Sequence, residues 1–141
     1  MIKTNWIRVL IGGLVAGAVL NILNFATLAI YLRDIWDPVV KAVNPVFQET
    51  TAFQVFWIIF HFVSGILAVW FYSAIRPRYG AGPKTAVIAG VAVFILQGLS
   101  FDFISGAFGL FPIKVLLIDA LTILVTSVIS TLAGAWVYKE E

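Results

Sequence analysis

The sequence predicts an all-α membrane protein built as a bundle of four transmembrane helices. One reason is composition, because 62% of the residues are apolar and 11% are charged, whereas a soluble domain averages about 45–50% and about 25%. The other reason is arrangement, because the apolar residues gather in four long runs that hold almost no charge. A helix needs about 20 apolar residues to cross the hydrocarbon core. We therefore expect one integral domain over residues 1–141, in contact with the lipid bilayer.

The four spans are expected near residues 7–32, 52–75, 84–105 and 113–138. The first run also has features of a cleaved signal peptide, because Lys3 and Arg8 precede it and Ala16-Gly17-Ala18 resembles a cleavage site. The apolar core of a signal peptide, however, is only about 7–15 residues long, and this run continues to Leu32. We therefore expect the first run to remain as a span.

The distribution of Lys and Arg predicts the orientation. With four spans, one side of the membrane holds Lys3, Arg8, Arg76, Arg78, Lys84 and Lys139, and the other holds Arg33, Lys41 and Lys114. Cytoplasmic loops carry the excess of Lys and Arg. Both termini are therefore predicted to be cytoplasmic, in a multi-pass arrangement.

The external segment 36–48 has a helical pattern of its own. Asp37-Pro38 is typical of an N-cap followed by proline at the first helical position. The apolar residues that follow recur at the spacing of a helix: Val39, Val40, Val43 and Phe47. This pattern predicts a short amphipathic helix on the outer membrane surface. Such a helix is either a lid over an outward-facing cavity or a linker anchored in the interface.

The two halves of the chain show signs of an internal repeat. An offset of 76 residues aligns the first span with the third, and an offset of 66 aligns the second with the fourth. The aligned pairs include Asn21 with Gln97, Ser64 with Ser130, Trp70 with Trp136 and Tyr72 with Tyr138. Two tandem helical hairpins would be related by a pseudo-twofold axis along the membrane normal. Convergence is the alternative, because aromatic residues gather at the ends of spans in any membrane protein.

Small residues mark the expected contacts between helices. Gly13 and Gly17 form a GxxxG pair, which lets a second helix approach closely. The fourth span has a small, weakly polar face that includes Ser127 and Thr131. These faces are predicted to pack against helices of this chain or of a partner.

A layer of polar side chains is predicted in the outer half of the membrane. Its members are Asn21, Asn24, His61 and Gln97. At about 1.5 Å per residue they lie about 18–22 Å from the cytoplasmic boundary of a core about 30 Å thick. Two interpretations stay open: a ligand-binding site among the first three spans, or hydrogen bonds that fix the register of the helices.

His61 has the widest range of roles. It is either a neutral histidine bonded to an amide or a proton-linked ligand contact. A single-histidine contact to haem, another pigment or a quinone is the remaining alternative, and no cofactor is predicted. With no cysteine and one histidine, the chain offers no zinc site.

The sequence does not favour an enzyme or a nucleic-acid-binding protein. It contains no nucleophile beside a base, no paired carboxylates within the membrane and no phosphate-binding loop, so no catalytic residue is assigned. A net charge of +2 is too small to indicate nucleic acid.

Three stretches resemble segments of small, uncharacterised bacterial integral membrane proteins of four spans. These are Arg8 to Gly17, Ile75 to Ala86 and Thr131 to Trp136. The resemblance implies a four-span fold in the bacterial inner (plasma) membrane. It implies no activity, cofactor or catalytic residue.

The expected function is that of an accessory, assembly or interaction subunit of a membrane complex. Its partners would be other membrane subunits or a second copy of the chain, bound through the small-residue faces. The alternative is a small-molecule or proton-linked transporter or channel that acts as a homodimer. In that case the polar layer would form its site.

Overall fold

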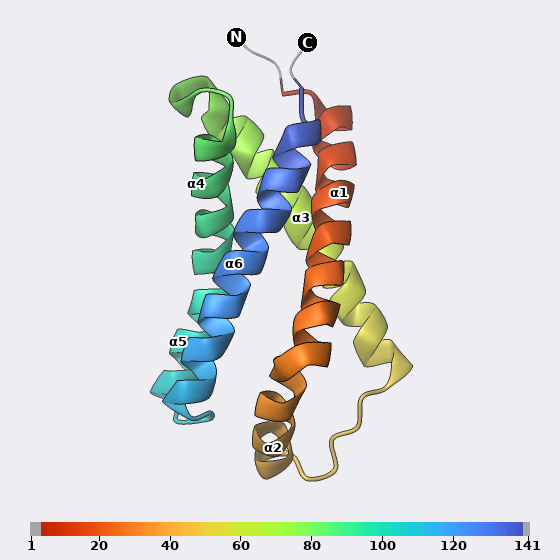
Figure 1. Cartoon of the computed structure of the whole chain (residues 1–141), viewed down its shortest axis with the longest axis vertical. Coiled ribbons are helices and arrows are strands. Elements are labelled where there is room, and N and C mark those ends of the chain that lie inside the picture. The colour runs from red at the N-terminus through yellow and green to blue at the C-terminus, as the bar shows by residue number, and fades with distance from the viewer. Residues whose placement is uncertain (1–3, 140–141) are drawn as a thin grey trace.

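The computed structural model describes residues 4–139, which form an all-α bundle of four long helices (Figure 1). The four candidate spans are Trp6–Val43, Thr51–Tyr79, Pro83–Ala107 and Ile113–Val137. Each is long and apolar enough to cross a membrane, so the chain is a multi-pass membrane protein. The first helix begins at the end of the bundle where the last helix ends. We call the opposite end the distal end. Lys3, part of the predicted basic start, lies outside the described residues.

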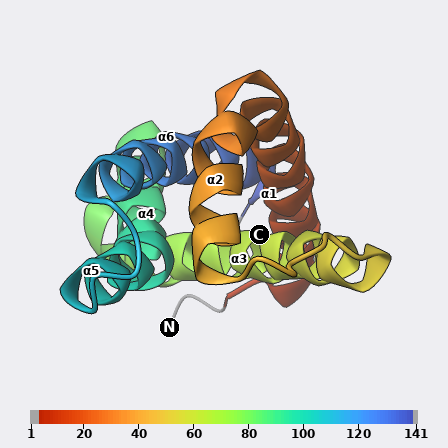
Figure 2. The same ribbon diagram turned by 90° about the horizontal axis from the view of Figure 1, so that it is seen from below.

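The first span continues into the external helix without a break. Helix α1 (Trp6–Thr27) begins where the Asn5 side chain accepts a hydrogen bond from the Arg8 amide at 3.1 Å. A π-helical turn, η1 (Leu28–Leu32), then leads into α2 (Arg33–Val43). The predicted N-cap at Asp37 is therefore wrong, because Asp37 and Pro38 lie inside a helix that the π turn has already redirected. Figure 2 shows α2 crossing the distal end of the bundle.

The second span is longer than its apolar run. Helix α3 (Thr51–Tyr79) is capped by the Thr50 hydroxyl, which accepts from the Phe53 amide at 3.2 Å. It passes Ile75 and includes the four residues that were expected to open a loop. Gly80 and Gly82 then end it, with φ angles of 85° and 134° that side chains disfavour. The connection to the third span is therefore a tight turn.

The second hairpin also contains a π-helical turn. Helix α4 (Pro83–Phe94) continues through η2 (Ile95–Leu99) into α5 (Ser100–Ala107). A turn with Gly109 at φ 64° leads to α6 (Ile113–Val137). The predicted ends of these two spans agree with the structure to within two residues.

Glycines bring the helices together in the half that holds the termini. Helix α1 packs against α3 and α6, and α4 packs against the same two helices. A Cβ atom on Gly65 would lie 2.4 Å from the Gly17 nitrogen and 2.5 Å from the Gly13 oxygen. On the other face of α1, a Cβ on Gly12 would lie 2.7 Å from the Gly134 oxygen. These crossings leave no room for a side chain.

The fourth span contacts the third through its small polar face. A Cβ atom on Gly90 would lie 3.1 Å from the Ser127 oxygen and 3.2 Å from the Thr131 Oγ1. The largest apolar core cluster lies nearby, in the half that holds the termini. Its members are Val9, Ala16, Val69, Tyr72, Ala86, Ala89, Ala135 and Tyr138.

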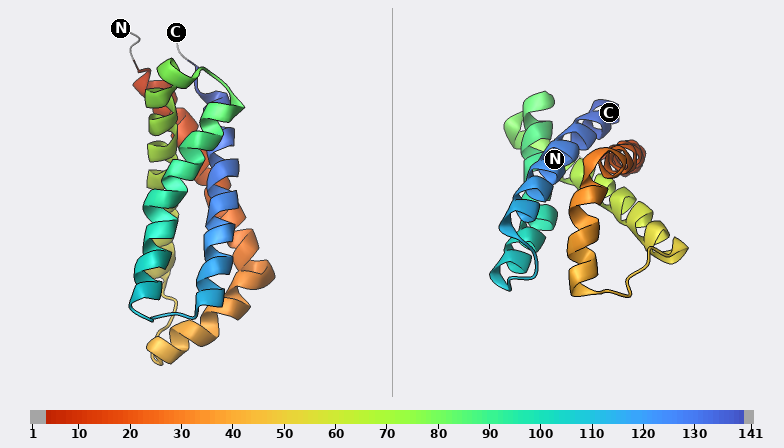
Figure 3. Two further views of the ribbon diagram at one scale, coloured as in Figure 1. Left: turned by 90° about the vertical axis from the view of Figure 1, so that its left-hand side faces the viewer. Right: turned by 60° about the horizontal axis from the view of Figure 1, so that its bottom comes forward.

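The bundle opens toward the distal end. Figure 1 shows α1 and α6 diverging as they run away from the termini, and Figure 3 shows the distal part of α3 separated from α4 and α6. The members of the apolar core cluster all lie in the other half.

Candidate functional site

Asn21 and His61 form the central polar contact between the first two spans. His61 Nδ1 lies 3.0 Å from Asn21 Oδ1, and Asn21 Nδ2 donates to the backbone oxygens of Gly17 at 3.0 Å and Ile58 at 3.3 Å. Because the amide oxygen only accepts, His61 donates from Nδ1. Gly17 makes this contact possible, since its missing side chain lets α3 approach. The contact links α1 to α3 at the point where the two helices begin to separate.

Asn24 and Gln97 do not join this contact. Both side chains are half-buried, and within residues 4–139 neither amide group forms a hydrogen bond. Gln97 lies in the π-helical turn η2 of the other hairpin. Of the four residues in the predicted layer, the structure thus brings two together and leaves two apart.

A carboxyl pair, with Asp102 buried and Asp119 half-buried, lies at the distal end of the second hairpin. The side chains of Asp102 in α5 and Asp119 in α6 are within hydrogen-bonding reach of each other. Asp102 is only 5% exposed, and no donor among the described residues reaches either of its oxygens. Both residues belong to candidate spans, so the second hairpin holds a carboxyl pair that the sequence did not predict.

The sequence held a signal for this pair. Asp102 precedes the end of α5 by five residues, and Asp119 follows the start of α6 by six. In an antiparallel hairpin, two residues equally far from the turn lie at the same level.

Trp36 closes the carboxyl pair from α2. Its Nε1 donates to Asp119 Oδ1 at 3.1 Å, and its ring packs edge-on against Phe111 with 4.9 Å between centroids. These contacts hold α2 across the distal end of the bundle, as Figure 2 shows. Beside them a hollow of about 480 Å³ separates α2 from the turn at residues 109–112. Helix α2 is thus attached to α6 at one point and is not sealed against it.

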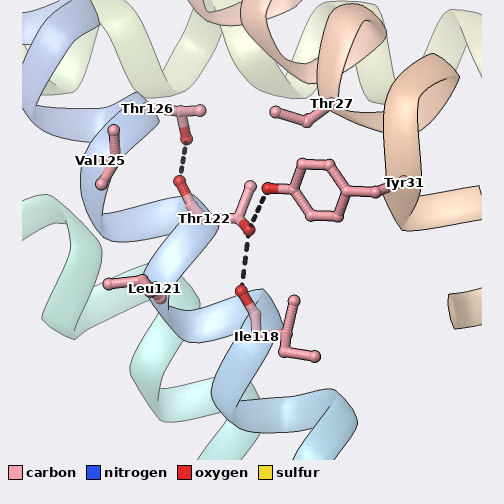
Figure 4. A pocket seen from close by; sticks show the side chains of 7 residues that line it. All are labelled: Thr27, Tyr31, Ile118, Leu121, Thr122, Val125 and Thr126. Carbon is pink, nitrogen blue, oxygen red and sulfur yellow. Dashed lines mark hydrogen bonds between the residues drawn. The ribbon is translucent and has the colours of Figure 1, made fainter.

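A groove lies between the first and fourth spans, close to this end. It has a volume of about 380 Å³ and is lined by Thr27, Tyr31, Ile118, Leu121, Thr122, Val125 and Thr126. In Figure 4 the Tyr31 hydroxyl points across the groove to Thr122, at 2.7 Å. Thr122 donates to the Ile118 oxygen at 2.8 Å, so Tyr31 is the donor in this bond. The hydroxyls of Thr27 and Thr126 donate to the backbone of their own helices at 3.0 Å and 2.9 Å, so the groove exposes mainly apolar atoms, which suits an acyl chain or another apolar group.

The distal part of α3 extends past the bundle, and the Ile58 backbone oxygen is where Asn21 Nδ2 of α1 reaches it, at 3.3 Å. Residues 51–59 are all exposed, and Figure 2 shows this part of α3 extending past the other helices. We call residues 51–59 the α3 arm. Aromatic rings run along the arm and its base: Phe53 and Trp57 have centroids 6.1 Å apart, and Trp57 and Phe60 have centroids 5.5 Å apart.

The structure offers few groups for metal binding. Among residues 4–139, no three His, Cys, Asp or Glu side chains lie together as metal ligands do. Ser64, one turn after His61, donates to the Phe60 oxygen at 2.8 Å, so its hydroxyl is bonded to its own helix.

Comparison with known proteins adds no further information about the site. No protein-family model matches the chain, and neither a curated protein nor a solved structure matches it.

Proposed function

We propose that this chain is a non-enzymatic accessory or assembly subunit of a complex in the bacterial inner membrane, with both termini cytoplasmic. In this proposal the α3 arm packs against a transmembrane helix of another subunit. One observation carries the proposal: all nine residues of the arm, 51–59, are exposed in the isolated chain.

The other three spans differ from α3 in this respect. The third and fourth spans have a buried residue close to the distal end, Ser105 and Val115, and the distal helix of the first span, α2, has half-buried residues such as Trp36. In α3, counted from its distal end, the first buried residue is His61. Lipid-facing residues are normal on one side of a membrane helix, but in the arm every residue is exposed, although Asn21 reaches the Ile58 backbone oxygen. A neighbouring helix would supply the packing that this chain does not.

The composition of the arm indicates the kind of partner. It carries no Lys, Arg, Asp or Glu and four large rings lie along it or at its base: Phe53, Phe56, Trp57 and Phe60. Lipid tails are as apolar as such a surface, so association in the membrane depends on close packing and not on the hydrophobic effect. Rigid rings favour packing because they lose little conformational entropy. The expected partner is therefore an uncharged helix with small residues between which the rings fit.

Site-specific photocrosslinking in the membranes of the native host tests this proposal. A photoreactive amino acid replaces Phe56, which is 62% exposed on the arm, or Leu117, which is 63% exposed on α6 and serves as the control. We expect one defined membrane protein to be crosslinked from position 56 and not from position 117. The same one-to-one complex should appear by native mass spectrometry and be lost on F56A/W57A. Equal labelling from both positions, or no adduct from position 56, contradicts the proposal.

A second candidate is a proton-linked transporter or channel that acts as a homodimer. It is supported by the polar groups in the distal half: the Asn21–His61 contact and the Asp102–Asp119 pair. Its test uses protons as the probe, in proteoliposomes that contain a pH-sensitive dye. Proton flux that requires the protein and is abolished by D102N supports this candidate, and flux equal to that of empty vesicles contradicts it. A crosslink between two copies from position 56 would favour this candidate over the assembly role.

We also propose that the bundle arose by duplication of a helical hairpin. The aligned residues Tyr72 and Tyr138 are both buried, and their rings meet edge-on with 6.0 Å between centroids. An axis between these two rings would exchange the α1–α3 contact with the α4–α6 contact. The π-helical turns depart from this symmetry, because η1 and η2 are 67 residues apart instead of 76.

A further inference from the structure

We propose that Asp102 and Asp119 form a binding site for a single proton, which the two carboxyl groups share. The site is independent of the assembly role proposed above, since it lies on α5 and α6 and not on the α3 arm.

The burial of Asp102 disfavours an ionised pair. Its side chain is 5% exposed, and neither oxygen accepts a hydrogen bond from the described residues. A carboxylate buried without donors or a counter-ion is strongly unfavourable within a membrane. Asp119 is the group within hydrogen-bonding reach, and it is also a carboxyl. Two such groups side by side cannot both carry a charge, so one proton between them satisfies both.

The charged groups around the pair do not replace this proton. All five of these charged residues are exposed: Arg33, Asp34, Asp37 and Lys41 on α2, and Lys114 on α6. Arg33 pairs with Glu49 at 3.4 Å, and no ion pair within residues 4–139 includes Asp102 or Asp119. The turn at residues 108–112 contains no titratable side chain. The pair therefore has no neutralising cation among the side chains around it.

The geometry favours a proton over a metal cation. Calcium requires about six to eight oxygen ligands, and no third acidic or imidazole group joins the two carboxyls among the described residues. One oxygen of Asp119 already accepts the Trp36 N–H at 3.1 Å. A donor at that position stabilises negative charge on Asp119 and would repel a cation. The Trp36 N–H therefore suits a pair in which Asp119 carries the negative charge and Asp102 carries the proton. Transfer of the proton along the hydrogen bond between the two carboxyl groups gives the reverse arrangement.

The proton site is coupled to α2 through Trp36. Helix α5 lies between the π-helical turn η2 and the turn at Gly109, so it is bounded by two irregular segments. Loss of the proton would place two charges side by side and drive α5 away from α6. Because Trp36 is bonded to Asp119 on α6, this displacement would change the contact that holds α2 across the distal end.

Infrared spectroscopy of the full chain in lipid nanodiscs tests the site, with protons themselves as the probe. At a pH where exposed carboxyl groups are ionised, we expect the wild type to show the C=O stretch of one protonated carboxyl per chain. We expect that band to be lost in both D102N and D119N, because each leaves a single carboxyl beside an amide donor. The control is D34N, which removes an exposed acid of α2 and should keep the band.

Three results would overturn the proposal. The first is a wild type without a protonated carboxyl at a pH where the exposed carboxyl groups are ionised, a measurement that does not depend on a variant. The second is a D119N band that matches the wild type, which would assign the proton to Asp102 alone. The third is loss of the wild-type band on adding sodium or calcium at constant pH, which would identify a cation site. None of these results bears on crosslinking from the α3 arm, so the two proposals fail separately.

Discussion

His61 Nδ1 lies 3.0 Å from Asn21 Oδ1, across the interface between α1 and α3. The same asparagine donates to two backbone oxygens, at 3.0 Å and 3.3 Å, so its amide group is fully used. The contact lies between the tightly packed half of the bundle and the open distal half. It therefore sets where α3 begins to leave α1.

Substitution of Asn21 by leucine should destabilise the protein. It leaves the His61 N–H without its acceptor, and polar contacts between membrane helices contribute about 0.6–1.7 kcal/mol. We expect a loss of about 1 kcal/mol, measured by unfolding in mixed detergent micelles. Asn24→Leu is the matched control, because Asn24 lies one turn further along and its side chain forms no hydrogen bond in the described chain. Equal losses for the two variants would contradict a specific role for Asn21.

Substitution of Gly65 by alanine should separate α1 from α3. The new Cβ would lie 2.4 Å from the Gly17 backbone nitrogen, so the two helix backbones must move apart. Overpacking of this kind costs about 1–3 kcal/mol, and we expect the melting temperature to fall accordingly. Gly106→Ala is the control, because the nearest atom there is the movable Leu116 Cδ1 at 3.2 Å. A Gly65→Ala variant as stable as the Gly106→Ala variant would refute the close crossing.

Substitution of Trp36 by phenylalanine should release α2 while keeping an aromatic ring at that position. The variant loses the 3.1 Å bond to Asp119, and hydrogen bonds to charged groups contribute about 1.5–3 kcal/mol. We expect hydrogen–deuterium exchange in residues 33–43 to become roughly tenfold faster or more, as such an energy implies. Trp70→Phe is the control, since Trp70 is exposed in the half that holds the termini. Unchanged exchange in α2 would show that the hydrogen bond does not hold this helix.

Substitution of Tyr31 by phenylalanine should widen the groove between α1 and α6 without removing its apolar lining. Tyr31 bridges the groove by donating to Thr122 at 2.7 Å. A neutral hydrogen bond contributes about 1 kcal/mol, so we expect a small loss of stability of that order. A spin-labelled acyl chain should then be held less rigidly than in the wild type. Thr27→Val, which changes another lining residue but keeps the bridge, should leave the chain's mobility unchanged, and equal mobility in all three proteins would contradict the prediction.

Sequence reasoning identified the spans because hydropathy and length determine them almost alone. It failed where the backbone departs from a regular α-helix. The helix continues through the π-helical turn at Leu28–Leu32 and past Asp37. Asp37 is therefore inside a helix and not at its N-cap, although its sequence pattern is typical of an N-cap. Pro77 likewise lies beyond the predicted end of the second span near residue 75, although α3 runs on to Tyr79.

The polar groups show a similar division. The depth of Asn21 and His61 followed from residue counts, but whether they meet depends on which helix faces turn toward each other. The Asp102–Asp119 pair was not predicted, because it depends on how the third and fourth spans face each other on either side of their turn. The exposure of the α3 arm could not be predicted from the sequence, because residues 51–59 are apolar like the packed parts of the other spans.

Native mass spectrometry of the protein, extracted in mild detergent from the membranes of its own host, tests the central proposal most directly. The assembly role predicts a one-to-one complex with a second membrane protein, which F56A/W57A abolishes while the bundle stays folded. A homodimer, or a monomer without a partner, would contradict that role.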